Sequence, residues 1–173
     1  MGDQKVRLRA MQAGDAGRVL AIYQAGIDTG HATFEAQAPD WPTFNAKYLP
    51  DCRLVALAGD AVAGWVGLTP VSSRAVYRGV AEHSIYIAPE ARGMGVGRTL
   101  LAALVAQSEP AGFWTLQTSI FPENEASIRL HADHGFRVIG TREKIARMTY
   151  GPMAGQWRDT VIMERRSAIA GQD

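Results

Sequence analysis

Three glycines that alternate with other residues, Gly93, Gly95 and Gly97, constrain this chain more than any other feature of its sequence. Residues 80–88 before them are alternating and rich in β-branched side chains, which predicts a strand. The apolar residues after them recur at helical spacing. Glycine lets backbone N–H groups converge without obstruction by a Cβ atom, and a helix N-terminus adds partial positive charge. The turn over residues 92–98 therefore predicts an anion site suited to a pyrophosphate.

Two better-known phosphate motifs do not fit this turn. The dinucleotide fingerprint needs a third glycine three residues after the second, where this chain has Arg98. The P-loop needs a lysine before its final serine or threonine, and here Arg98 precedes Thr99. Arg92 and Arg98 instead add fixed positive charge at the rim of the turn. A helix start that simply requires a tight turn remains the plain alternative.

The rest of the chain alternates between strand and helix signals. Six further strands are predicted, over residues 6–10, 53–58, 61–71, 113–120, 136–148 and 156–165. Helices are predicted after Asp15 as a possible cap, at Asp40-Trp41-Pro42 with Asp40 as the cap, and from Val96 onward. A further helix is predicted between Asn124, which we expect to be its cap, and Gly135. This order predicts an α/β (α+β) fold with one mixed, mostly antiparallel central sheet of about seven strands and helices on both faces. The length fits one domain over residues 1–173.

Composition narrows the classes of function. Hydrophobic residues make up 47% of the chain and charged residues 20%, which is enough for a packed core. The formal net charge of +1 gives no general attraction to nucleic acid or to an acidic membrane. No segment reaches the roughly 18 apolar residues of a membrane span. Residues 1–5 lead into no apolar run of a secretion signal, so we expect a cytoplasmic protein.

Cysteine and histidine content also limits the chemistry. The single cysteine, Cys52, excludes an internal disulfide and suits a reducing compartment. We expect it to be a half-buried strand residue rather than a nucleophile. His131 and His134 have a spacing that metal ligands can use, but no third ligand lies at a suitable distance along the chain. No metal is therefore expected.

Two segments together resemble one enzyme superfamily. Arg92-x-x-Gly95-x-Gly97, after a strand and at the start of a helix, resembles the acetyl-CoA motif of the GNAT acetyltransferases. The segment 124–131, followed by Gly135-Phe136, is similar to the second landmark of that superfamily. The resemblance extends over residues 6–165. It implies the GNAT fold, and it implies that the amides of the glycine turn hold the pyrophosphate of CoA.

Three further segments, 81–87, 129–131 and 155–159, resemble the phosphinothricin N-acetyltransferase group. That group includes enzymes that act on methionine sulfoximine, methionine sulfone and arsinothricin. Residues 33–35 and the Arg-Glu-Lys at 142–144 look similar to the arsinothricin-type members. The resemblance implies acetyl-CoA as co-substrate, a small amino-acid-like amine as acceptor, and a homodimer. One departure is the hairpin over 146–154, which looks longer than in relatives.

An ammonium group must lose a proton before it can attack a thioester, so a base is needed. Glu82 is the first candidate, because it precedes the glycine turn on the predicted strand and the resemblance implies the same role. Glu82, Ser84 and Tyr86 share one face of that strand, although a solvated glutamate is the plain alternative. His131 stands where many GNAT enzymes have a proton-donating tyrosine. It could act as acid or auxiliary base, or be structural.

Binding roles follow from the resemblance and, for Arg74, from the need for a cation beside the anionic groups of the substrate. The cofactor candidates are Ile85, Ile87, Arg92, Gly93, Met94, Gly95, Val96, Gly97, Arg98, Ser119, Asn124 and Ser127. The substrate candidates are Phe34, Glu35, Arg74, Glu82, Thr118 and Trp157. Plain alternatives exist: Arg74 as a solvated loop residue, Phe34 as a hydrophobic plug and Trp157 as a core residue.

Other functions remain open at this point. A peptide or protein N-terminal acetyltransferase would need an open groove, whereas the crowded loop around Phe34 favours a closed pocket. A CoA-binding sensor without turnover would have no need for Glu82 and His131. A nucleotide-binding module is a more distant alternative.

Overall fold

The computed structural model describes residues 6–172; residues 1–5, where no secretion signal is expected, and residue 173 lie outside this part. Its strands are β1 (Arg7–Ala10), β2 (Leu54–Ala58), β3 (Ala61–Pro70), β4 (Val80–Ile87), β5 (Thr115–Ile120), β6 (Arg137–Arg147) and β7 (Trp157–Arg166). Its α-helices are α1 (Ala16–Ile27), α2 (Trp41–Lys47), α3 (Val96–Ser108) and α4 (Glu125–Ala132). Short 3-10 helices cover Ala13–Asp15, Ala75–Tyr77, Pro89–Ala91 and Gly151–Met153. Every helix in residues 6–172 is too short or too polar to traverse a lipid bilayer.

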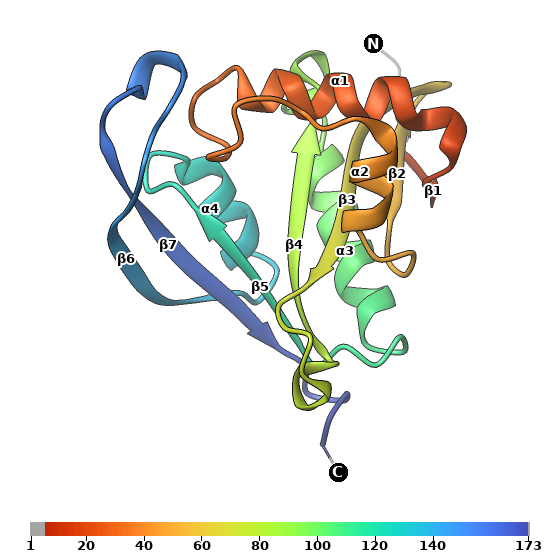
Figure 1. Cartoon of the computed structure of the whole chain (residues 1–173). Helices are drawn as coiled ribbons and strands as arrows, with labels where there is room; N and C mark the ends of the chain where they lie inside the picture. The colour runs from red at the N-terminus through yellow and green to blue at the C-terminus, as the bar shows by residue number, and fades with distance from the viewer. Residues whose placement is uncertain (1–5, 173) are drawn as a thin grey trace.

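The strands form one sheet in the order β1-β2-β3-β4-β5-β7-β6. Each neighbouring pair is antiparallel except β4 and β5, which run parallel. The prediction of a mixed, mostly antiparallel sheet is therefore confirmed. The last strand of the chain lies between β5 and β6, so β6 forms one edge of the sheet (Figure 1).

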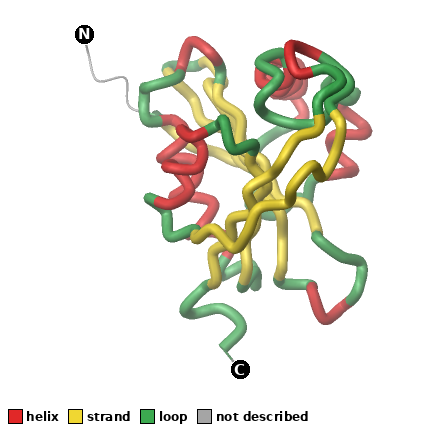
Figure 2. Tube along the Cα trace, turned by 90° about the vertical axis from the view of Figure 1, so that its left-hand side faces the viewer, coloured by secondary structure: helices red, strands yellow, loops and turns green. Residues whose placement is uncertain are grey.

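Helices cover both faces of the sheet, as the sequence predicts. On one face Gly26 of α1 packs against the ring of Tyr86. On the other face Gly97 of α3 approaches Ile87 of β4 and Leu130 of α4. Tyr86 and Ile87 are consecutive in β4, so their side chains point to opposite faces. Figure 2 shows the strands as a layer with helices on either side of it.

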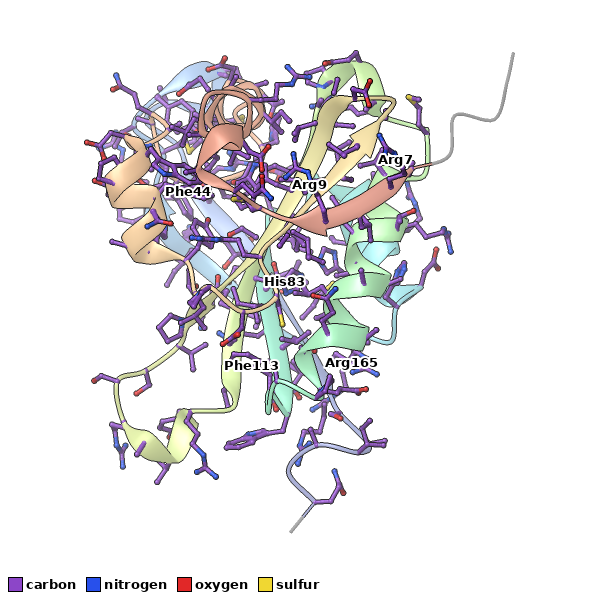
Figure 3. All side chains as sticks on the ribbon, turned by 90° about the vertical axis from the view of Figure 1, so that its right-hand side faces the viewer. Arg7, Arg9, Phe44, His83, Phe113 and Arg165 are labelled. Atoms are coloured by element: carbon purple, nitrogen blue, oxygen red, sulfur yellow. The ribbon has the colours of Figure 1, made fainter. Side chains whose placement is uncertain are left out.

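The core beneath α1 and α2 is a cluster of aromatic rings around Trp65 of β3, which is fully buried. Trp65 stacks on Tyr86 with ring centroids 5.1 Å apart and meets Tyr23 and Phe44 edge-on. Phe44, labelled in Figure 3, comes from α2, and Tyr23 comes from α1. Such pairs add to the burial of large apolar rings. They attach both helices to β3 and β4 and thereby fix the strand on which the site is built.

Two capping predictions are confirmed and one is wrong. Asp40 and Asn124 accept backbone N–H groups in the first turns of α2 and α4. Asp15 stands before α1 but makes no cap bond, because Arg9 and the N–H of Gln12 occupy its carboxylate oxygens. Hydrogen bonds that join two charged groups are stronger than a neutral cap. Asp15 therefore fastens β1 to the chain before α1.

The prediction that Cys52 is a half-buried strand residue is wrong. Cys52 lies in the turn before β2, with a left-handed backbone (φ 58°), and it is buried. Burial, with repulsion from Asp51, raises the pKa of the thiol to about 11. The thiol therefore stays protonated near neutral pH and is a poor nucleophile.

Candidate active site

β4 and β5 separate after only three residue pairs. Residues 80–82 pair with residues 115–117 of β5, whereas β4 pairs with β3 over residues 81–87. The edge of β4 over residues 83–87 therefore has no strand partner on the β5 side, and the two strands visibly diverge in Figure 1. An unpaired strand edge presents free N–H and C=O groups. The opening can thus hold a ligand that offers matching donors and acceptors.

A cleft of about 1170 Å³ occupies this opening. Its walls come from α1, the α1–α2 loop (residues 28–40), β4, the glycine turn (residues 92–98), β5, α4 and β6. A single drug-sized ligand typically occupies a pocket of about 300–1,000 Å³. The cleft is therefore large enough to bind a cofactor and a small substrate side by side.

The glycine turn forms an open cradle in this cleft. Gly93 and Gly95 both have φ of 77°, in the left-handed region that glycine tolerates. A Cβ atom at either position would meet nothing within 4 Å, so the space beside them is open. Gly95 is the N-cap of α3, whose first-turn N–H groups have no acceptor within the helix. Free N–H groups and a helix dipole together fit a diphosphate.

Arg92 and Arg98 flank the cradle as exposed side chains. Arg98 donates a hydrogen bond to Asp133 just after α4, at 3.1 Å. This ion pair links the start of α3 to the end of α4. Both guanidinium groups raise the positive potential at the rim.

Glu82 lies where β4 and β5 part, with its side chain half-buried at the cleft. Gln117 of β5 donates from Nε2 to a carboxylate oxygen of Glu82 at 3.3 Å. Ser84 and Tyr86 share the face of Glu82 by strand alternation and also line the cleft. Tyr48 donates its hydroxyl to Oγ of Ser84 at 3.1 Å. A carboxylate in this position can accept a proton from an amine bound on the α1–α2 side.

The cleft lining combines charges of both signs with neutral hydroxyl groups. Lys47, Arg142 and Glu35 line it together with Glu82. Burial, and then the charge of Glu35, raise the pKa of Tyr23 to about 12. Tyr23 therefore remains a neutral phenol beside the charged groups. This mixture suits a zwitterion better than an apolar ligand.

His131 of α4 contacts His83 of β4, on the face of the sheet opposite Glu82. The two Nε2 atoms lie 2.8 Å apart and both side chains are buried; His83 is labelled in the interior in Figure 3. Burial, and then repulsion from His131, lower the pKa of His83 well below its usual value. Burial also lowers the pKa of His131. Both rings are therefore neutral near pH 7.

No metal site was expected at His131 and His134. Across residues 6–172, no three His, Cys, Asp or Glu side chains gather as metal ligands would. Nδ1 of His134 lies instead 2.7 Å from the carbonyl of Leu130, one turn back on α4. That position is a usual one for a structural histidine hydrogen bond.

The cleft brings together most of the residues that the sequence singles out. Both catalytic candidates, Glu82 and His131, line it. So do the cofactor candidates Ile85, Ile87, Arg92, Gly93, Gly95, Val96, Gly97, Arg98, Ser119, Asn124 and Ser127. Of the substrate candidates, Phe34, Glu35 and Thr118 line it as well.

Three candidates lie away from the cleft lining. Met94, in the glycine turn, is 42% exposed and does not line the cleft. Arg74 lies in the connection between β3 and β4, where its guanidinium is 5.5 Å from the ring centroid of Tyr77. Trp157, at the start of β7, is 59% exposed, so it is no core residue, and it borders a second, shallower groove. A loop or strand-end position does not fix where a side chain points, which is why the sequence could not exclude these three.

Arg158 of β7 holds the α1–α2 loop against the rest of the site, and its side chain is only 2% exposed. Its guanidinium donates to the carbonyl of Gly30 at 3.0 Å and to the carboxylate of Glu123 at 3.2 Å. The same group lies 3.9 Å from the ring centroid of Phe121. A planar guanidinium can stack and donate at once, which a lysine cannot do.

The β6–β7 turn (residues 148–156) contacts the same loop. Tyr150 donates its hydroxyl to the carbonyl of Thr33 at 2.8 Å. Phe34 of the loop packs edge-on against Phe121, with ring centroids 4.9 Å apart. The loop and the turn therefore form one packed cover beside the cleft.

Sequence reasoning missed His83, Lys47, Arg142 and Arg158. Strand alternation does place His83 on the face opposite Glu82, and so could have indicated a helix residue as its partner. Arg158 lies in the segment 155–159 that resembles the phosphinothricin group, but nothing in that segment indicates its bond to Gly30, which joins residues 128 positions apart. Lys47 and Arg142 likewise reach the cleft only through the packing of α2 and β6.

The chain is similar to known acetyltransferases over most of its length. The model of the acetyltransferase (GNAT) family matches residues 23–136. The phosphinothricin N-acetyltransferase of Alcaligenes faecalis is 36% identical, over 91% of this chain and 81% of that protein. The L-methionine sulfoximine/L-methionine sulfone acetyltransferase of Pseudomonas paraeruginosa is 28% identical, over 91% of this chain and 92% of that protein. A solved phosphinothricin acetyltransferase from Sinorhizobium meliloti, in complex with AcCoA, has a TM-score of 0.85 at 30% identity, covering 97% of this chain and 91% of that one.

Replacing Arg158 by lysine removes the guanidinium group that hydrogen-bonds to the α1–α2 loop and stacks on Phe121, but it keeps the positive charge. We expect the loop to open more often, so that a glutamate-specific protease cuts after the exposed Glu35 several-fold faster. The free energy of unfolding should fall by about 1–3 kcal/mol, the worth of one or two hydrogen bonds to a charged group. Arg165→Lys is the matched control, because Arg165 pairs with Glu109 away from the loop. Equal cleavage of the two variants would contradict this role of Arg158.

Proposed function

Because this chain belongs to the acetyltransferase (GNAT) family, we propose that it transfers the acetyl group of acetyl-CoA to the α-amino group of a small amino-acid analogue. The analogues in view are phosphinothricin, methionine sulfoximine, methionine sulfone and arsinothricin, whose acetylation would give resistance to the toxin. One observation carries the proposal: Glu82 stands where β4 and β5 part, in the same cleft as the open glycine cradle. A base and an anion cradle in one cleft suit acyl transfer better than binding alone.

The residues of the cleft fit acetyl-CoA, which supplies an activated thioester when bound. The amides of residues 93–98 would hold its diphosphate. The free edges of β4 over residues 83–87 and of β5 over 118–120 would hydrogen-bond its amide-containing arm. A main-chain N–H near Ile87 would polarise the thioester carbonyl. Asn124 and Ser127 face the same space from the start of α4.

Glu82 and His131 would act from opposite faces of the sheet. Glu82 shares its face with Tyr86, beneath α1, whereas His131 meets His83 on the face of α3 and α4. Glu82 would accept the ammonium proton of the substrate, directly or through water. His131 would stand on the cofactor side of the opening. An amine and a thioester that enter from the two faces would therefore meet between β4 and β5.

The charges along the cleft support an amino-acid-like substrate. Glu82 and Glu35 suit an ammonium group, and Lys47 and Arg142 suit a carboxylate and a second anionic group. The cover that Arg158 holds over this region favours a free small molecule over a peptide terminus. A peptide would need the α1–α2 loop displaced.

A homodimer and a cytoplasmic location stay part of the proposal. β6 forms one edge of the sheet and exposes Val138, Ile139 and Ile145 by 53%, 46% and 49%. Exposed apolar side chains on an edge strand are typical of an interaction surface. They support assembly with a second copy without identifying the contact.

The direct test is a thiol-release assay with acetyl-CoA and a panel of amines. The panel contains the four analogues, ordinary amino acids and short peptides with free N-termini. We expect turnover with at least one analogue and little with the peptides. Preferential turnover of the peptides would favour an N-terminal acetyltransferase, and binding of CoA without turnover of any amine would favour a sensor; either result rejects the proposal.

Replacing Glu82 by glutamine keeps the size of the side chain and removes the base. We expect kcat to fall by about 100-fold or more, within the range for loss of a general base, while the affinity for CoA is unchanged. Glu35→Gln is the matched control, since Glu35 is a carboxylate on the α1–α2 loop that also lines the cleft. That variant should raise KM for the amine more than it lowers kcat. A Glu82→Gln enzyme with normal kcat would remove Glu82 as the base.

Replacing Gly95 by alanine tests the cradle. The left-handed backbone disfavours alanine by about 1–2 kcal/mol, and the new Cβ would enter the cleft. We expect the Kd for CoA, measured by calorimetry, to rise about tenfold or more. Gly112→Ala is the control, because Gly112 is also left-handed (φ 90°) with open space around it but does not line the cleft. Both variants should lose similar stability, and equal CoA affinities in the two would exclude the glycine turn as the diphosphate site.

A further inference from the structure

Two buried histidine rings meet at the point where the cleft begins. His83 directly follows Glu82, the last residue of β4 that pairs with β5. Its Nε2 lies 2.8 Å from Nε2 of His131, and the two rings are 2% and 1% exposed. Phe136 packs against both rings, with centroids 5.2 Å from each. The pair thus joins β4 to α4 at the inner wall of the cleft, where both rings are almost fully buried.

The contacts of His131 decide which of its nitrogens carries the proton. Nδ1 of His131 lies 2.7 Å from the carbonyl oxygen of Ser127, which can only accept. Nδ1 must therefore be protonated, and Nε2 of the neutral ring carries a lone pair. A contact of 2.8 Å between two nitrogens needs one hydrogen between them, and His83 must supply it from Nε2.

The opposite arrangement is disfavoured on both rings. If His131 carried its proton on Nε2, the lone pair of Nδ1 would face the Ser127 carbonyl at 2.7 Å. If His83 carried its proton on Nδ1 instead, the lone pairs of the two Nε2 atoms would face each other at 2.8 Å with no hydrogen between them. One direction of donation, from His83 to His131 to Ser127, satisfies the most groups.

The surroundings favour a neutral pair. Burial lowers the pKa of His83 well below its usual value, and the carbonyl of Gln117 offsets this only in part. Burial also lowers the pKa of His131; the Ser127 carbonyl opposes this, and the charge of His134 adds to it. Glu82, on β4, points to the other face of the sheet from His83 and so offers the pair no countercharge on its own face.

We propose that His83 is a positioning residue that acts through His131: its Nε2–H holds His131 neutral, in the single tautomer that directs Nδ1–H toward Ser127. This inference rests on the proposed function, since it concerns the cofactor side of the same site. Ser127 lines the cleft, and its hydroxyl oxygen lies 3.4 Å from Nδ1 of His131. In this state both ring nitrogens of His131 are engaged, Nδ1–H with the Ser127 carbonyl and Nε2 with His83. His131 cannot take up the ammonium proton, because its lone pair is already occupied, so that proton falls to Glu82.

The tautomers can be read without any turnover, from nitrogen shifts of isotope-labelled histidine rings. The chain has 4 histidines, so substitution of each one in turn assigns the signals. We expect His131 protonated on Nδ1 alone and His83 protonated on Nε2 alone in the native protein at about pH 7. A native spectrum with His131 protonated on Nε2, or with His131 doubly protonated, would overturn the proposal. Because no substrate is needed, this result stands even if the acetyltransferase assay fails.

Two variants of His83 separate positioning from filling of space. His83→Phe keeps a ring but has no donor, whereas His83→Gln keeps an N–H that can reach Nε2 of His131. We expect His83→Phe to let His131 populate both tautomers. It should lower kcat about tenfold, which corresponds to the loss of one hydrogen bond. It should also move the acid limb of the pH–rate profile toward higher pH. KM for the amine should stay within about twofold, and His83→Gln should restore most of kcat.

The matched control is His134→Phe, a change in the turn just after α4 that touches neither nitrogen of the pair. It should leave the tautomer of His131 in place. If His83→Phe keeps both the native tautomer of His131 and the native pH profile, His83 only fills space and the proposal is wrong. The dispersion of the spectrum reports in the same sample whether each variant is folded.

Discussion

The early parting of β4 and β5 is the constraint on which the rest of the structure depends. Three pairs hold the strands together, and from His83 onward the edge of β4 has no neighbour on that side. A sheet interrupted at its centre would be unstable without compensation, because free main-chain groups must find partners. The aromatic cluster around Trp65 fixes β4 from one face, and α3 with α4 fixes it from the other. The packing thus keeps the opening rigid enough to be a site.

Most of the fold could be predicted from local patterns in the sequence. Strand alternation, helical spacing and the caps at Asp40 and Asn124 depend on neighbours in the chain, so each was visible in the sequence. The position of β7 between β5 and β6 could not be predicted from the sequence, because strand order depends on contacts across the whole molecule. Asp15 failed as a cap for a related reason: the guanidinium of Arg9, from a strand, competed for its carboxylate.

The candidate site likewise contains residues that the local sequence indicates and residues that only the fold brings together. The glycine turn and Glu82, which both line the cleft, could be singled out from residue type, spacing and the family resemblance. His83 looked like any alternating strand residue, and only the approach of α4 gives its ring a partner. Arg74 and Trp157 were candidates by residue type, yet neither side chain lines the cleft. A functional motif that lies within one short segment can be recognised in the sequence. A functional contact between residues far apart in the chain can be identified only once the fold is known.

The joint between the α1–α2 loop and the β6–β7 turn has an evolutionary consequence. Gly30 sits so near Pro152 that a Cβ atom there would come within 2.9 Å of the proline ring, and Tyr150 is bonded to the same loop. A residue gained or lost in the turn must therefore shift the loop, while β4 and the glycine turn stay where they are. Under the proposed function, insertions and deletions in this hairpin would change the selectivity among amines and leave the glycine turn, on the acyl-donor side, in place.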